Sequence, residues 1–377
     1  MSTSPTPFAK RVLYYSIMVV VLLLIVELLS RAYYYQYLSP RPIAFVQVAK
    51  DLRDKARAWV SPDLEMERLE KAQRLVRPGL SQTTARAIVR ELRRANRSVY
   101  QPWVEFAFQD FHGNYLNVTD RVRRSIPDGS DSTEKNPFTI FFIGGSTTFG
   151  FGVTDSETIP SCFVRAYRQT HPNGRPIRVV NLGMPFYYSY QELIQIADLL
   201  FRDEKPDMMI MLDGVNDCLD ANDAYKRAPA FAIGKGNIFR PDSKEDTKQQ
   251  LADYPNLPAG LNLDSASKMI SRRYLDNIRH AHDLAALYHI PLYCFWQPVP
   301  YYDYPNRSND PICIQTSSPR FEHIYPLVRT GGAALPWFFY LGDMLEKERG
   351  FPFIDQIHYS PKFSQAIAEK MLSLISL

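Results

Sequence analysis

The stretch Phe138-Thr139-Ile140-Phe141-Phe142-Ile143-Gly144-Gly145-Ser146 decides how this chain folds. The nearly unbroken apolar run predicts a buried strand, and the glycine pair predicts a sharp turn at the end of that strand. Because glycine carries no side chain, the turn can be tight and can present Ser146 at the carboxyl end of the strand. Ligands of open α/β sheets bind at that end. Taken alone, the motif is more typical of a polar turn or a helix cap than of a functional site.

Other motifs of the same kind follow along the chain. Residues 179–183, Val-Val-Asn-Leu-Gly, form a second apolar run that ends in glycine. A third run, Met-Met-Ile-Met-Leu at 208–212, leads into Asp-Gly-Val-Asn-Asp at 213–217, and Asp355-Gln356-Ile357-His358 stands near the C-terminus. Serine, glycine, asparagine and histidine therefore occur in this order, each at a strand end or in a late loop.

This arrangement resembles the SGNH hydrolases, also called the GDSL esterase and lipase family. Ser146 matches the nucleophile block, although the chain reads Gly-Gly-Ser-Thr where many members read Gly-Asp-Ser-Leu. Gly183 matches the second block and Asn216 the third, while Asp355 and His358 match the Asp-x-x-His block. Each block is short, but four blocks in the right order and strand context make a strong signal.

Strand and helix patterns alternate from residue 136 to residue 377. This alternation predicts a three-layer α/β/α sandwich with a parallel sheet, which is also the SGNH or flavodoxin-like fold that the resemblance implies. Ser360 and Pro361 predict the start of the last helix. The predicted strands are 138–143, 177–181, 207–212, 292–296 and 353–354, and the predicted helices are 157–170, 189–202, 266–288, 334–348 and 361–376.

Four further segments complete the predicted organisation. Residues 41–98 predict a helical spacer, with Ser81 as a helix cap, and residues 99–135 predict short extended strands. Residues 219–265 and 298–333 have no place in a minimal fold, and we expect them to be insertions into the hydrolase domain. Long loops of this kind are lids, substrate walls or disordered segments.

Residues 12–30 are almost entirely apolar and follow a short tail, residues 1–11. A helix over them would be about 27 Å long, enough to cross a hydrocarbon core. Tyrosines on both sides predict interfacial anchors. A cleaved signal peptide and a buried core helix are the alternatives to a single-pass membrane anchor. We expect the catalytic domain to be extracytoplasmic, because a short N-terminal tail suits a signal-anchor.

The resemblance implies a chemistry for the matched residues. Ser146 would be the nucleophile, His358 its general base, and Asp355 the carboxylate that orients the imidazole. The oxyanion donors would be the backbone N–H groups of Ser146 and Gly183 and the side-chain amide of Asn216. A capped turn before the last helix is the structural alternative for the Asp-x-x-His block.

The predicted activity is hydrolysis of an ester-linked acyl group on an O-acylated carbohydrate or a lipid ester. An O-acyltransferase acting on a cell-envelope glycan is the close alternative, and a non-catalytic surface or assembly protein on the same fold is the distant one. Asp213, Tyr187 and Tyr188 are candidates for contact with substrate.

Composition and residue spacing argue against several classes of binding partner. The 377 residues carry a net charge of +4 with 22% charged residues, so we expect no nucleic acid partner. No cluster has metal-ligand spacing, and we expect neither a metal nor a cofactor. The four cysteines form no Cys-x-x-Cys motif. A disulfide between Cys294 and Cys313 and a buried free thiol both remain open for Cys294.

Overall fold

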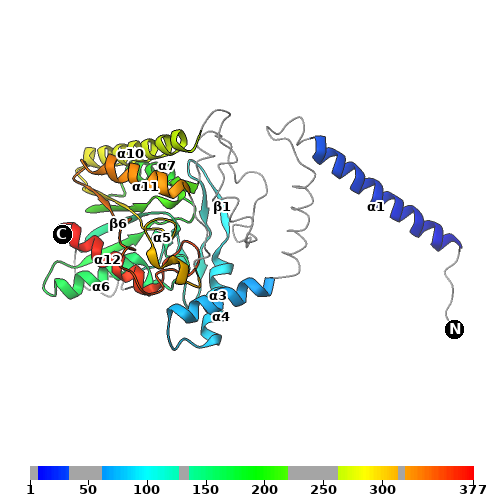
Figure 1. Cartoon of the computed structure of the whole chain (residues 1–377), viewed down its shortest axis with the longest axis horizontal. Coiled ribbons are helices and arrows are strands. Elements are labelled where there is room, and N and C mark those ends of the chain that lie inside the picture. Colours follow the sequence, from blue (N-terminus) through cyan, green and yellow to red (C-terminus); the bar gives the residue numbers. More distant parts are fainter. Residues whose placement is uncertain (1–6, 34–61, 127–135, 220–261, 313–318) are drawn as a thin grey trace. The chain divides into compact units, whose positions relative to one another are not determined.

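The computed structural model describes residues 7–33, 62–126, 136–219, 262–312 and 319–377 (Figure 1). The chain divides into two units, Met1–Pro62 and Asp63–Leu377. The second unit contains the central sheet and every residue of the predicted active site.

A mostly parallel sheet forms the centre of the second unit. Its strand order is β10-β9-β8-β6-β7-β5-β4-β3. The strands from β10 to β7 pair in parallel, and β5, β4 and β3 extend the sheet in antiparallel pairing. Because parallel strands end at one edge, the segments that follow β6, β7 and β8 meet there. The strands are β3 (Phe111–His112), β4 (Asn117–Thr119), β5 (Val122–Arg123), β6 (Phe138–Gly144), β7 (Ile177–Asn181), β8 (Met208–Asp213), β9 (Leu292–Trp296) and β10 (Phe338–Tyr340).

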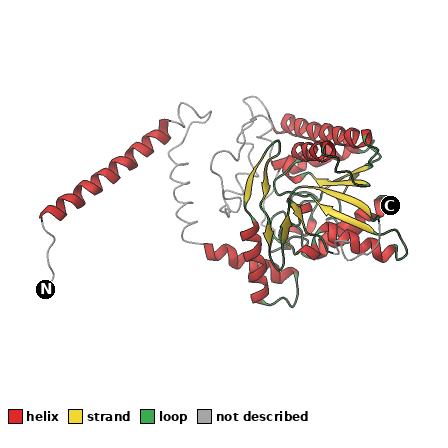
Figure 2. Cartoon of the chain, turned by 180° about the vertical axis from the view of Figure 1, so that it is seen from behind, coloured by secondary structure: helices red, strands yellow, loops and turns green. Residues whose placement is uncertain are grey.

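Helices cover both faces of this sheet (Figures 1 and 2). Helices α7, α10 and α11 pack on one face, and α6 and α12 pack on the other. Short helices follow the strand ends and connect the layers. The helices of the domain are α5 (Ser146–Phe149), η2 (Asp155–Glu157), α6 (Ile159–Thr170), α7 (Ser189–Phe201), α8 (Val215–Leu219), α10 (Leu263–Leu287), η3 (Pro305–Asn309), α11 (Pro319–Gly332) and α12 (Pro361–Leu374).

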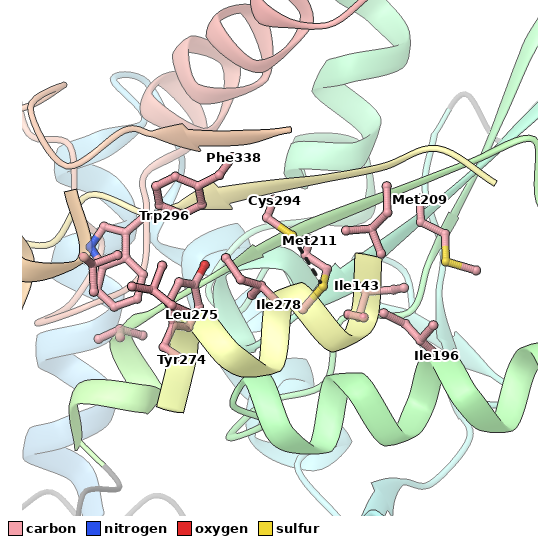
Figure 3. Packing of buried hydrophobic residues seen from close by; sticks show 14 of the residues in the cluster. Ile143, Ile196, Met209, Met211, Tyr274, Leu275, Ile278, Cys294, Trp296 and Phe338 are labelled. Atoms are coloured by element: carbon pink, nitrogen blue, oxygen red, sulfur yellow. Dashed lines mark hydrogen bonds between the residues drawn. The ribbon is translucent and has the colours of Figure 1, made fainter. Parts of the chain in front are cut away.

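The period of two along each strand divides the core between the two faces. Met209 and Met211 of β8 face α7 and α10, and Figure 3 shows them beside Ile196 and Ile278 of these helices. Their neighbour Ile210 faces α6 and α12 instead. Each such side chain is fully buried, which stabilises the fold by roughly 1.5–3 kcal/mol per residue. The apolar strand ends therefore hold the edge of the sheet rigidly.

Four of the predicted strands are confirmed to within one residue at each end. The predicted strand at 353–354 is wrong, because Phe353 forms an isolated bridge with Tyr359. The predicted helix at 334–348 is also wrong, since this segment contains β10, which pairs with β9 through Phe338 and Cys294. The helix lies earlier, as α11, inside the segment predicted as an insertion. Most of the other predicted insertion, residues 220–261, lies outside the described residues.

The start of the second unit is helical and then extended, as predicted for its described parts. Helix α4 (Gln82–Ala95) begins at the predicted cap, where the Ser81 hydroxyl accepts a hydrogen bond from the Thr84 N–H. Strands β1 (Ser98–Gln101) and β2 (Glu105–Phe108) then form an antiparallel pair. Residues 41–61 of the predicted spacer and 127–135 of the predicted extended segment lie outside the described residues.

Helix α3 (Pro62–Val76) precedes α4 and contacts the segment that follows α5. The Gln73 side chain donates to the Gly152 carbonyl at 2.9 Å, and the Arg77 guanidinium binds the carboxylate of Glu157. Ala72 packs against Ile354, one residue before Asp355. The part of the predicted spacer that the structure describes thus belongs to the same compact unit as the sheet.

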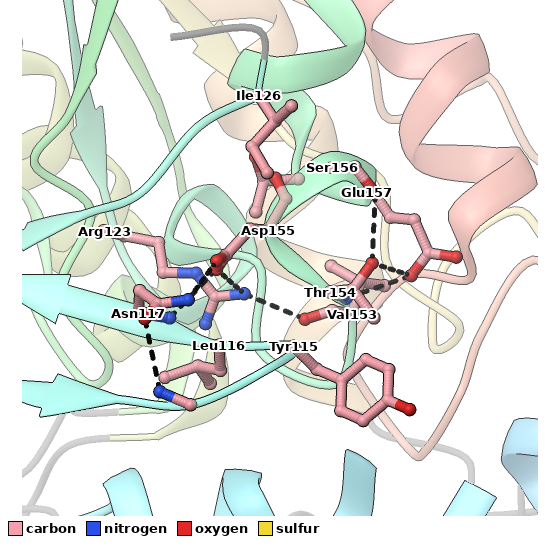
Figure 4. A network of polar contacts seen from close by, with 12 residues as sticks. Tyr115, Leu116, Asn117, Arg123, Ile126, Val153, Thr154, Asp155, Ser156 and Glu157 are labelled. Atoms are coloured by element: carbon pink, nitrogen blue, oxygen red, sulfur yellow. Dashed lines mark hydrogen bonds and ion pairs between the residues drawn. The ribbon is translucent and has the colours of Figure 1, made fainter. Parts of the chain in front are cut away.

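A buried ion pair supports the same segment from β5 (Figure 4). The Arg123 guanidinium lies 3.1 Å from the Asp155 carboxylate and donates to the Val153 carbonyl at 3.0 Å. Asn117 donates to Asp155 from both its backbone and its side chain. Arg123 also lies over the ring of Phe149, the last residue of α5. This network fixes α5 against the antiparallel edge of the sheet.

In the first unit, residues 7–33 form one helix, α1 (Pro7–Tyr33), so the helical part of the N-terminal prediction is correct. Among the described residues, no helix has the length and apolarity required to cross a membrane, and the predicted transmembrane span at 12–30 is therefore not confirmed.

Candidate active site

Ser146 is the first residue of α5, directly at the end of β6. Gly145 caps this single-turn helix, and the Phe149 N–H donates to its carbonyl at 3.0 Å. The Ser146 side chain sits at the sheet edge with 8% of the residue exposed. The prediction that the glycine turn presents Ser146 at the strand's carboxyl end matches this placement.

Ser146, His358 and Asp355 form one chain of hydrogen bonds. The Ser146 Oγ lies 2.8 Å from His358 Nε2, and His358 Nδ1 lies 2.6 Å from Asp355 Oδ2. The serine and the histidine are 212 residues apart in sequence, so only the fold brings them together. Both distances are within hydrogen-bond reach, which is the geometric requirement for a hydroxyl nucleophile with an oriented base.

The turn that carries His358 also fixes its carboxylate partner. Asp355 Oδ1 accepts the backbone N–H groups of Ile357 and His358, each at 2.8 Å. Burial alone would raise the pKa of Asp355, but the adjacent His358 and these hydrogen bonds lower it below its usual value. Asp355 therefore stays ionised, and it can hold the Nδ1–H tautomer while Nε2 faces Ser146.

Two contacts around His358 were not predicted from the sequence. The ring of Phe151 packs against the imidazole with centroids 4.6 Å apart. Tyr359, the next residue, accepts a hydrogen bond from the Gln297 side chain at 3.2 Å, and Gln297 in turn accepts from Thr147 Oγ1 at 3.3 Å. These contacts join the histidine loop, α5 and the end of β9. Aromatic and amide residues in loops carry no signal that identifies such partners in advance.

Asn216 follows β8 and lies beside the serine. Its Nδ2 donates to the Tyr187 carbonyl at 2.8 Å. A Cβ added to Gly145 would lie 2.8 Å from this same nitrogen, so the amide passes directly over Gly145. Because an amide NH₂ carries two hydrogens, the bond to Tyr187 uses one of them. The structure thus places the Asn216 amide at Gly145, the residue that precedes Ser146.

The Gly183 amide, predicted as an oxyanion donor, has a hydrogen-bond partner within the protein. Its backbone N–H donates to the side chain of Asn181 at 3.0 Å, so this amide is already engaged. The glycine is required for another reason: a Cβ here would lie 2.4 Å from the backbone nitrogen of Phe149. The absence of a side chain therefore lets the segment after β7 pack on α5. Three residues later, Phe186 has a left-handed backbone with φ of 72°, a conformation unusual for a bulky residue.

The three residues predicted to contact substrate have surroundings within the protein. Tyr187 is buried, and its hydroxyl donates to the Phe106 carbonyl, so it is part of the core. Asp213 is 2% exposed and points into the interior. Tyr188 is half-buried and stacks beneath the guanidinium of Arg273. All three side chains thus have structural partners or interior positions that the sequence pattern did not indicate.

Asp213 belongs to a buried acidic cluster that we call the carboxyl pair, Asp213 and Glu192. Burial and the charge of Asp217 together raise the pKa of Asp213 to about 7, against hydrogen bonds with Glu192 and Tyr274 that lower it. Burial also raises the pKa of Glu192, and Asp213 adds to this effect. Two carboxylates cannot face each other in the interior without a proton between them, because their like charges repel at low dielectric. The folded protein therefore holds a proton at this pair.

Cys162, Cys218 and Cys294 are free and buried, and Cys313 lies outside the described residues. Burial raises the pKa of the Cys162 thiol to about 11, so it remains a neutral thiol. In the part of the chain that the structure describes, no group of His, Cys, Asp and Glu side chains has the arrangement of a metal site.

Comparison with known proteins gives structural neighbours and no sequence relatives. No family model and no curated protein matches the chain. A gut microbial diltiazem-metabolizing enzyme aligns with 64% of this chain at 16% identity and a TM-score of 0.39. The aligned part is 48% of that enzyme, so the chain spans about half its length.

Two further neighbours align with nearly their full lengths. A carbohydrate acetylesterase family member from Sinorhizobium meliloti is 13% identical over 63% of this chain and 99% of its own, with a TM-score of 0.37. A lipase from a goat rumen metagenome is 12% identical over 63% of this chain and 97% of its own, with a TM-score of 0.42.

Proposed function

We propose that this protein is an SGNH-type serine esterase that cleaves ester-linked acyl groups. The observation that carries the proposal is the hydrogen-bonded chain from Ser146 through His358 to Asp355 at the edge of a parallel sheet. A purely structural turn would place an aspartate beside a histidine, but it would not require the second imidazole nitrogen to face a serine hydroxyl 212 residues away.

The geometry suits acyl transfer in two steps. Ser146 Oγ attacks the ester carbonyl carbon while its proton passes to His358 Nε2, and Asp355 stabilises the imidazolium that results. The Asn216 amide and the Ser146 N–H are the donors that we assign to the oxyanion. Collapse of the tetrahedral intermediate releases the alcohol, which takes the proton from His358. Water, deprotonated by His358, then cleaves the acyl-enzyme and regenerates Ser146.

The substrate class that we propose is an O-acylated carbohydrate or a lipid ester. The same acyl-enzyme would make an O-acyltransferase if a sugar hydroxyl of a cell-envelope glycan replaced water in the second step. An assay with an acetylated sugar donor, with and without a free sugar acceptor, separates the two outcomes through the ratio of acetate to acetylated acceptor.

The nucleophile is tested with Ser146→Ala. We expect this variant to lose fluorophosphonate labelling and to hydrolyse p-nitrophenyl acetate about 10⁴-fold more slowly, since the acyl-enzyme cannot form. Ser156→Ala is the matched control, because Ser156 is exposed and lies ten residues downstream on the next short helix. Circular dichroism checks that both variants fold. Wild-type activity in pure Ser146→Ala would exclude the proposed function.

We further propose that the N-terminal helix associates with a membrane and that the catalytic domain is extracytoplasmic. The support is α1, where the large apolar side chains from Tyr14 to Leu29 are each about half exposed. Full-length protein is then expected in the membrane pellet after a carbonate wash, whereas a chain starting at Arg41 is expected in the supernatant. Protease access to residues after 40 in intact cells tests the orientation, and full protection would contradict it.

A further inference from the structure

Asn216 and its neighbour Asp217 hold the same segment of chain. Asn216 donates to the Tyr187 carbonyl at 2.8 Å. Asp217 accepts two hydrogen bonds from Ser189, which is the first residue of α7: one from the backbone N–H at 3.2 Å and one from the hydroxyl. Adjacent residues of α8 therefore bind residues 187 and 189, on the two sides of Tyr188.

A residue of a third element fixes the polarity of this contact. Asn277 of α10 donates from Nδ2 to Ser189 Oγ at 2.9 Å. The hydroxyl proton of Ser189 is thereby directed at Asp217, and Asp217 must act as the acceptor. Asp217 is fully buried, and burial raises its pKa, while the charge of Arg273 in the same α10 and the hydrogen bonds from Ser189 oppose this effect. The hydrogen bonds therefore lead from Asn277 in α10 to Ser189 in α7, and from Ser189 to Asp217 in α8.

This arrangement determines where the Asn216 amide can lie. The amide passes over Gly145, at the position where any side chain would collide with it. Its orientation depends on the Tyr187 carbonyl, and the position of that carbonyl depends on how α7 begins. A shift of about 1 Å in such a group can lower a rate by about 100-fold.

We propose that Asp217 is a positioning residue for the oxyanion site: by binding both polar groups of Ser189, it fixes the start of α7 and holds the Asn216 amide beside Ser146. This inference rests on the proposed function, and it adds that Asp217 acts through Asn216 without touching substrate. The Ser189 and Asn277 side chains complete the positioning contact.

Asp217→Asn tests the inference in the full-length protein. The new amide can accept only one of the two Ser189 donors, and its own NH₂ opposes the other. We expect kcat for p-nitrophenyl acetate to fall about 10–100-fold with little change in KM, since the loss affects the transition state. Asn216→Ala is expected to lose about 10²–10³-fold in kcat. Asp276→Asn is the control, because Asp276 is half exposed beside Asn277.

The double variant decides whether Asp217 acts through Asn216. We expect Asn216→Ala with Asp217→Asn to be no slower than Asn216→Ala alone, because the second change removes support for an amide that is already absent. Losses that multiply in the double variant would overturn the proposal, as would a change in KM alone or a wild-type kcat in Asp217→Asn.

Hydrogen exchange separates this inference from the proposed function. In Asp217→Asn, peptides that cover 184–191 are expected to exchange faster, while peptides from β9 are unchanged. If the wild-type protein has no Ser146-dependent turnover, the proposed function fails, and the exchange rates still decide whether Asp217 holds this segment. Unchanged exchange at 184–191 would overturn the inference even in an active enzyme.

Discussion

Two buried polar clusters lie near the candidate site, one made of opposite charges and the other of two acidic groups. In one, Arg123 and Asp155 carry opposite charges 3.1 Å apart, and burial lowers the pKa of Arg123 to about 10 and raises that of Asp155. In the other, Glu192 and Asp213 carry the same kind of group, and burial raises both pKa values. In the first cluster the Arg123 cation compensates the buried negative charge, and in the second a bound proton does so.

The two clusters differ in whether a neighbouring cation favours the charged form of the carboxylate. Burial raises the pKa of Asp155, whereas Arg123 and two donors from Asn117 favour its charged form. Asp213, with a pKa of about 7, changes its protonation in the physiological range. The Arg123 cluster supports the loop after α5, whereas Asp213 immediately precedes the turn that carries Asn216.

Removing the cation from the first cluster is expected to give the largest loss of stability. Arg123→Met leaves the Asp155 carboxylate buried without its charge partner, and we expect the free energy of unfolding to fall by about 3–5 kcal/mol. Urea unfolding followed by circular dichroism measures it. Asp155→Asn added to Arg123→Met is expected to recover part of this loss, because the unpaired charge is then gone.

The control for that comparison is Arg202→Met. Arg202 pairs with Asp198 and Glu204, but its side chain is 42% exposed, so we expect a change of about 1 kcal/mol or less. Equal losses at positions 123 and 202 would show that burial does not distinguish the two ion pairs.

The carboxyl pair is expected to give a smaller effect that depends on pH. Because the folded pKa of Asp213 is raised to about 7 from its usual value of 3.8, the folded state binds this proton more tightly than the unfolded state. The resulting stability is complete below about pH 4 and is lost as pH rises to about 7. Asp213→Asn removes this loss, so the variant should gain stability relative to wild type between pH 5 and pH 8.

Thermal unfolding at these two pH values measures the change. We expect the variant's Tm relative to wild type to rise by roughly 2–4 °C for each kcal/mol gained in the free energy of unfolding. Asp203→Asn is the control, since that carboxylate is 81% exposed. Parallel Tm curves for wild type and Asp213→Asn across this range would mean that no proton is held at the pair.

The sequence was sufficient for the four parallel strands β6, β7, β8 and β9, because long apolar runs such as 138–143 determine their own burial. It failed for β10, a three-residue edge strand that exists because Phe338, Phe339 and Tyr340 pair with β9. Short strands depend on partners that are distant in sequence, and an apolar stretch without strong alternation fits a helix equally well.

For the candidate site, the sequence indicated which residues come together better than it indicated which of their polar groups already have partners. Ser146, His358 and Asp355 meet as predicted, and Asn216 lies beside them. The sequence did not indicate that the Gly183 amide donates to Asn181, or that its small size serves the packing of α5. Which backbone groups are free, and which tyrosines are buried, depends on contacts that cross the whole domain.

The hydrogen bond between Ser146 and His358 has a consequence for the time course of folding. It spans 212 residues. Such distant contacts form late, because the chain loses entropy on closing a long loop before the contact can stabilise it. Helices and local turns return first when a denatured chain refolds, and they contribute no catalysis by themselves. The esterase activity that we propose would therefore recover after the circular dichroism signal, and a ribosome-bound chain would stay inactive until the turn that carries His358 has emerged.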